Sequence, residues 1–180
     1  MSAFLKNDVT LVSQTSSNHL NDVVDLSEHW SGSISISLFT YSVDFEYALR
    51  SLIQLYLCFP KIKDRVSFHV VFPINNKELL PSFKYDLDCK RRSDPSVVMN
   101  YEIDGIEYPH NLLRNTAIKF SKTKYVFLID IDMVPNLNLR DDFNRFIFDK
   151  KQPVNESVVF VVPSFESNDD IDIPKDRENL

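Results

Sequence analysis

The stretch YVFLIDIDMVP, from Tyr125 to Pro135, decides the fold that the sequence predicts. Five apolar or aromatic residues run directly into two aspartates, Asp130 and Asp132, which a single isoleucine separates. A short segment that is apolar on both faces is typical of a strand in the middle of a parallel sheet whose faces are both covered. The sequence therefore predicts a buried strand over residues 125–129, with two carboxylates at its carboxyl end.

The rest of the chain alternates between strand and helix patterns. Alternating or β-rich stretches predict strands, and apolar residues at spacings of three and four predict helices. Further strands are expected over 9–15, 33–40, 66–72, 96–103 and 157–162, and helices after Ser16 and Ser17, after Asp44, from Pro109 and over 139–148. Pro60 is expected to stop the helix that Asp44 caps. This alternation indicates an α/β fold, with a mostly parallel sheet flanked by helices.

The 180 residues are enough for one domain with a hydrophobic core, expected over residues 1–166. Residues 75–95 are charged and aperiodic and are interpreted as a surface insertion. Residues 167–180 are polar and acidic and are interpreted as a disordered tail.

Composition excludes several functional classes. The chain has only 2 glycines, Gly32 and Gly105, so it lacks the Gly-rich phosphate loops of P-loop and dinucleotide-binding proteins. The net charge of −6 is spread over mixed signs, so no nucleic-acid partner is expected. No apolar run has the length of a membrane span. Cys58 and Cys89 fit either a disulfide or two free thiols, and Asn155 begins a glycosylation triplet.

The aspartate pair is interpreted as a metal site because of its place after a buried strand. The same spacing occurs at Asp86 and Asp88 and at Asp170 and Asp172, but in polar, aperiodic surroundings. Ligands of open α/β sheets collect beyond the carboxyl ends of the strands. Aligned carboxylates suit Mn²⁺, or alternatively Mg²⁺, and such a metal can hold a diphosphate. The alternative is that Asp130 caps a turn and Asp132 is simply solvated.

The helix expected from Pro109 carries polar residues that point to a ligand. Asn111, Arg114 and Asn115 form a polar stripe at helical spacing, expected opposite Leu112 and Leu113. A guanidinium near Asp130 could bind phosphate or sugar oxygens. The alternative is an ordinary amphipathic helix. The four histidines share no ligand spacing, and His69 and Trp30 are interpreted as core residues.

Three stretches resemble one family of enzymes. DVTLVSQTSSNHLNDVVDLSEHWSGSISISLFT, YPHNLLRNTAIKFSKTKYVFLIDIDMVPN and VVFVVPSFE, in this order, are similar to the LARGE-like and beta-1,4-glucuronyltransferase 1 family of glycosyltransferases. The resemblance runs from about Val9 to Glu166, interrupted by the charged insertion. Its most specific part combines Tyr108-Pro109 and the Asn111–Asn115 run with Asp130-Ile131-Asp132.

The resemblance implies a GT-A fold, Mn²⁺ dependence and inverting transfer from a UDP-sugar to a glycan in the Golgi lumen. Glucuronic acid is the donor sugar that it favours, and xylose-containing glycans on glycoproteins are the acceptors. Asp130 and Asp132 match the family's metal-binding DxD motif. The residues that would bind the donor nucleotide are Gln14, Thr15, Asn111, Arg114 and Asn115.

Two departures from the family leave alternatives open. Its members carry an N-terminal membrane anchor and continue past VVPSFE, so the chain is expected to be a fragment whose catalytic base lies elsewhere. An inactive, glycosyltransferase-like module is therefore one alternative. The other is a haloacid-dehalogenase-like phosphatase, which also places an Asp-x-Asp pair after an apolar strand, with the first Asp as nucleophile.

Overall fold

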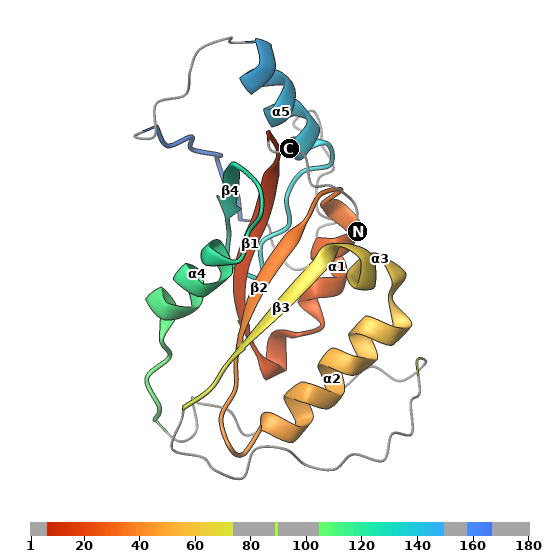
Figure 1. Ribbon diagram of the computed structural model, residues 1–180, viewed down its shortest axis with the longest axis vertical. Coiled ribbons are helices and arrows are strands. Elements are labelled where there is room, and N and C mark those ends of the chain that lie inside the picture. The colour runs from red at the N-terminus through yellow and green to blue at the C-terminus, as the bar shows by residue number, and fades with distance from the viewer. Residues whose placement is uncertain (1–6, 74–88, 90–104, 150–157, 167–180) are drawn as a thin grey trace.

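The computed structural model describes residues 7–73, 89, 105–149 and 158–166. In these ranges the strands are β1 (Val9–Ser16), β2 (Ile34–Phe39), β3 (Val66–Val71) and β4 (Tyr125–Leu128). The helices are the 3-10 turn η1 (Ser17–His19), α1 (Asp22–His29), α2 (Phe45–Cys58), α3 (Pro60–Arg65), α4 (His110–Lys119) and α5 (Leu139–Asp149). The strands pair in parallel, in the order β3-β2-β1-β4 (Figure 1). The predicted α/β class is confirmed.

Helices cover both faces of this sheet. In β2, Ile34, Ile36 and Leu38 point into a core cluster that also holds residues of α1, α2 and α3. The alternate side chains face α4, where the Ser35 hydroxyl donates to the carbonyl of Ala117 at 2.8 Å. Because successive strand residues point to opposite faces, α4 lies across the sheet from α1–α3. Trp30 is almost fully buried, as expected.

The predicted boundaries of α2 are confirmed, and the structure adds a detail at each end. Asp44 occupies the N-cap position, but its side chain makes no capping hydrogen bond. Its carboxylate instead accepts hydrogen bonds from the Thr40 hydroxyl, the Tyr41 N–H and the Ser17 hydroxyl, which ties the ends of β1 and β2 together. Pro60 does end α2, but it also begins α3, because the first helical position requires no backbone N–H.

The expected central position of the 125–129 strand is wrong for the described part of the chain. There β4 pairs only with β1 and forms one edge of the sheet, with Val126 and Leu128 40% and 43% exposed. The reason is that residues 158–162, expected to form a buried strand, pair with no described strand and are exposed. Phe160 nevertheless packs edge-on against Phe143 of α5, with ring centroids 5.4 Å apart.

Cys58, at the end of α2, forms a disulfide with Cys89, with 5.4 Å between the Cα atoms. Of the two possibilities that the sequence left open, the structure therefore has the paired one. None of the helices in the described ranges combines the length and the apolar character needed to cross a membrane. The predictions for residues 75–95 (apart from Cys89), 96–103 and 167–180, for Asn155 and for the two comparison aspartate pairs concern residues outside the described ranges.

Candidate donor site at the carboxyl edge of the sheet

The strand order reverses at β1, between β2 on one side and β4 on the other. From β1 the chain adds β2 and β3 on one side, and β4 then returns to the other side of β1. Ligands of such sheets bind where the order reverses, beyond the carboxyl ends of the strands. Val12 of β1 pairs with Leu128 of β4, and the Ile129 N–H donates to the Val12 carbonyl at 3.1 Å. Gln14 and Asp130 each lie two residues after this pair, at the carboxyl edge of the sheet.

The aspartate pair does not have the extended geometry that the sequence suggested. The strand ends at Leu128, and the Met133 N–H donates to the Asp130 carbonyl at 3.2 Å, which closes a turn. Asp130 and Asp132 are both exposed. Their alignment as residues i and i+2 of a strand is therefore wrong, because the backbone turns between them.

Two hard, exposed carboxylates next to a basic side chain are a donor set that suits Mn²⁺ or Mg²⁺. Within the described ranges, no group of three or more His, Cys, Asp or Glu side chains is poised to hold a metal. Protein side chains of this part thus supply two carboxylates at most, and the diphosphate oxygens of a ligand would complete the coordination. The metal site remains a prediction.

Arg114 reaches the first aspartate. Its Nη2 atom donates to Asp130 Oδ1 at 3.0 Å, while its buried Nε has no partner. The two side chains are 38% and 54% exposed, and ion pairs this open are worth about 0–1 kcal/mol. Exchanging this contact for a phosphate oxygen therefore costs Arg114 little.

The inner face of α4 differs from the expected one. Leu113 and Ala117 are fully buried, whereas Leu112 is 55% exposed. Residues 110, 113, 114 and 117 are spaced as one helical stripe, so His110 and Arg114 lie on the sheet side with Leu113. The predicted polar stripe opposite both leucines is thus wrong for Arg114. Asn111 and Asn115, the other two members of the predicted stripe, are both exposed.

His110 is a site residue that the sequence analysis missed. Its Nδ1 lies 3.2 Å from Nε2 of Gln14, and Gln14 is 93% buried with an Oε1 atom that has no partner. The signal was present: His110 precedes Arg114 by one helical turn. The structure thus shows two separate contacts at this edge: Gln14 with His110, and Arg114, one helical turn further along α4, with Asp130. Thr15 is buried, and its hydroxyl donates to the Ser16 carbonyl, so its nucleotide role remains a prediction.

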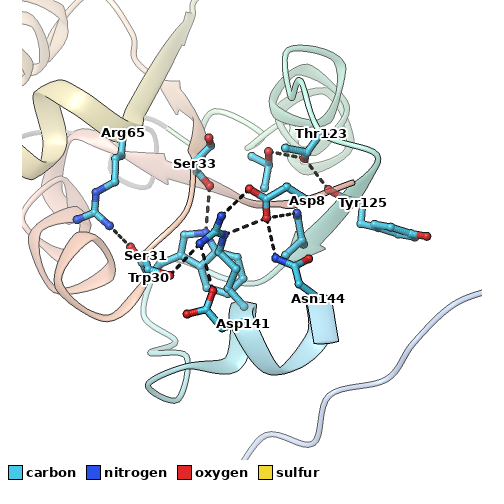
Figure 2. Close-up of polar contacts among 12 residues, drawn as sticks. Asp8, Trp30, Ser31, Ser33, Arg65, Thr123, Tyr125, Asp141 and Asn144 are labelled. Atoms are coloured by element: carbon cyan, nitrogen blue, oxygen red, sulfur yellow. Dashed lines mark hydrogen bonds and ion pairs between the residues drawn. The ribbon is translucent and has the colours of Figure 1, made fainter. Parts of the chain in front are cut away.

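A second missed cluster holds the segment after the aspartates in place (Figure 2). Arg140 of α5 donates from Nε and Nη2 to the two carboxylate oxygens of Asp8, at 2.9 and 2.7 Å. Asn144 donates to the same carboxylate at 2.9 Å. Gly32 lies beneath, where a Cβ would be only 2.6 Å from Cδ of Arg140. The turn at Asp130 is therefore held on both sides. Before the turn, Ile129 bonds to β1, and after it, Arg140 bonds to Asp8 at the start of β1.

These contacts stabilise the charged forms of Asp8 and Arg140. Burial alone would raise the pKa of Asp8, but hydrogen bonds from Arg140, Asn144 and the Val9 N–H outweigh it and lower the pKa. The same carboxylate raises the pKa of Arg140, against the opposing effect of burial. Asp8 and Arg140 thus form a permanently charged pair at neutral pH.

A cavity of about 490 Å³ lies elsewhere, at the amino edge of the sheet. Its lining includes Glu28, Lys61 and Arg65, and none of the candidate donor residues. Lys61 is ion-paired with Glu28, and Arg65 donates to the carbonyls of Trp30 and Ser27. Since these charges are already paired within the fold, the cavity does not mark the site.

The parallel sheet flanked by helices is consistent with an α/β domain of the glycosyltransferase A type. The chain belongs to the family described as "Glycosyl-transferase for dystroglycan", whose model matches residues 8–180. This membership favours the glycosyltransferase interpretation over the phosphatase alternative.

Named relatives agree with this family. The chain is 31% identical over 172 residues to beta-1,4-glucuronyltransferase 1 of Danio rerio, covering 88% of this chain and 39% of the relative. It is 28% identical to xylosyl- and glucuronyltransferase LARGE2s of Gallus gallus, over 89% of this chain and 17% of the relative. It is 27% identical to human xylosyl- and glucuronyltransferase LARGE1, over 89% of this chain and 17% of the relative. The chain thus spans less than half the length of each of these relatives.

Proposed function

We propose that this chain forms the donor-binding part of a metal-dependent, inverting glycosyltransferase. Its donor is a UDP-sugar, with glucuronic acid favoured because the Danio rerio relative is named a glucuronyltransferase. Its acceptor is a glycan on a glycoprotein. The observation that carries the proposal is the Arg114–Asp130 contact at 3.0 Å, at the switch point beside Gln14.

The side chains divide the work of donor binding between them. Arg114 can turn its guanidinium from Asp130 to the diphosphate, whose oxygens it matches in geometry. Asp130 and Asp132 would hold Mn²⁺ or Mg²⁺, which when bound neutralises the diphosphate and stabilises it as a leaving group. A general base would take the proton of the acceptor hydroxyl. The hydroxyl oxygen would then form its bond to the anomeric carbon as the carbon–oxygen bond to the diphosphate breaks, and the diphosphate would leave with that bond's electrons.

We place this reaction in the lumen of the Golgi apparatus. The Cys58–Cys89 disulfide supports that proposal, because disulfides persist in oxidising compartments and are rare in the cytosol.

Calorimetric titration with UDP, with and without Mn²⁺, tests the proposal. We expect Mn²⁺-dependent binding that Asp130→Asn and Asp132→Asn abolish, with the fold retained because both side chains are exposed. Asp64→Asn, at an exposed position of α3, is the matched control and should bind as the wild type does. If Asp130→Asn and Asp132→Asn bound UDP with the same affinity as the wild type, the metal assignment would be refuted.

A further inference from the structure

The contact between Gln14 and His110 favours one tautomer of the imidazole ring. With its amide oriented so that Nε2 lies 3.2 Å from His110 Nδ1, Gln14 can only donate at this contact. We take the His110 Nδ1 atom as the acceptor, which in a neutral imidazole leaves the single hydrogen on Nε2. Since the two ring nitrogens are on different sides of the ring, this Nε2–H points away from Gln14.

The surroundings of this N–H suit an anionic ligand. His110 is exposed and is the first residue of α4, a ten-residue helix whose positive dipole end lies there. The cationic Arg114 follows one turn later, and Asp130 faces Arg114 rather than His110. The Tyr108 ring packs edge-on against the imidazole, with centroids 4.6 Å apart, and limits its rotation.

Gln14 also shows a sign of a missing partner. It is 93% buried, and its Oε1 accepts no hydrogen bond from any residue in the described ranges. Buried acceptors in native structures nearly always have a partner, so an unpaired one at this edge indicates that a ligand or an ordered water completes it.

We infer that His110 binds the donor directly, donating its Nε2–H to an oxygen of the nucleoside diphosphate, and that Gln14 is the positioning residue that holds this tautomer. The inference rests on the proposed function for the identity of the ligand. In this inference the diphosphate is bound by a neutral hydrogen-bond donor, His110, as well as by the cationic Arg114. Gln14 acts only by positioning His110.

The tautomer can be measured without any ligand. In nitrogen-15 NMR spectra of the imidazole at a pH where His110 is neutral, we expect Nε2 to be protonated and Nδ1 to be unprotonated. Gln14→Leu should reduce that preference, while the resonances of His29, at the opposite edge, should not change. Protonation of Nδ1 in the wild type would overturn the positioning role.

Two substitutions separate the functions of the two ring nitrogens in UDP titrations with Mn²⁺. His110→Asn keeps an acceptor near the Nδ1 position but has no donor reaching the Nε2 position, so it should weaken UDP binding about tenfold. His110→Gln can place an amide N–H near the Nε2 position and should retain more of the affinity. His29→Asn is the matched control and should bind as the wild type does.

The outcomes distinguish this inference from the proposed function. If the wild type binds UDP and His110→Asn binds it equally well, His110 is not a donor-binding residue, and the proposed function stands. If the wild type does not bind UDP at all, both fall. Circular dichroism of each variant verifies that the fold is intact.

Discussion

Arg140 and Asp8, 132 residues apart in sequence, meet through two parallel hydrogen bonds of 2.9 and 2.7 Å. The Asp8 side chain is 7% exposed, so a guanidinium fork satisfies a carboxylate that water hardly reaches. This pair joins the start of the first strand to the helix that follows the aspartate turn.

Removing one partner of this pair should destabilise the fold. Arg140→Ala leaves the Asp8 carboxylate buried without its cation, which costs about 3 kcal/mol. Urea unfolding measures the loss. Arg145→Ala is the matched control, since its ion pair with Asp142 is largely exposed, and it should change the free energy of unfolding by less than about 1 kcal/mol. Similar effects of both substitutions would contradict the role assigned to Asp8.

The lowered pKa of Asp8 gives stability a definite pH dependence. The unfolded chain binds a proton at Asp8 near pH 3.9, whereas the folded protein binds it only at lower pH. The pair's contribution should therefore be complete well above about pH 4 and be lost as the pH falls through the folded pKa. Urea unfolding of wild type and Asp8→Asn from pH 7 to 3 should show the difference between them shrinking toward acid pH. A difference that grows on acidification would mean that the sign is wrong.

The position of α4 on the sheet can be tested with two adjacent leucines. Leu113 is fully buried, so Leu113→Ala should cost about 3 kcal/mol of unfolding free energy. Leu112→Ala, at a side chain 55% exposed, should cost less than about 1 kcal/mol. Thermal or urea unfolding compares the two. The opposite ranking would restore the helix orientation that the sequence pattern first suggested.

The Cys58–Cys89 bond should contribute substantially to stability, because it closes a loop with a sequence separation of 31. A loop of that length implies about 3–4 kcal/mol from the reduced entropy of the unfolded chain. Cys58→Ser with Cys89→Ser should lose this amount in urea unfolding under oxidising conditions. Adding a reductant to the wild type should cause a similar loss, while the double variant should not respond to it.

Local patterns in the sequence were enough to predict the order of most described elements, although not α3 or the turn η1. The apolar periodicity of α2 and the alternation in β2 depend on neighbours within a few residues, so they can be recognised without the fold. The family resemblance, carried by the run around Asp130, was confirmed over most of the chain. It could therefore identify the class before any contact was known.

The contacts that build the site were not predictable in this way. Gln14 and His110 are 96 residues apart, and only the packing of α4 on the sheet brings them together. The orientation of α4 was misjudged because Leu112 and Leu113 are both apolar, and only packing distinguishes them. The turn at Asp130 was only the alternative interpretation, because the apolar sequence up to Ile129 is the same whether the strand continues or a turn follows.

The open side of β4 has a consequence for handling the protein. Within the described ranges, its outer backbone amides and carbonyls pair with no other strand and run beside half-exposed Val126 and Leu128, which is a template for edge-to-edge pairing with another molecule. The net charge of −6 opposes such encounters, and salt screens that repulsion. Concentrated samples at high ionic strength are therefore the conditions under which this protein should begin to aggregate.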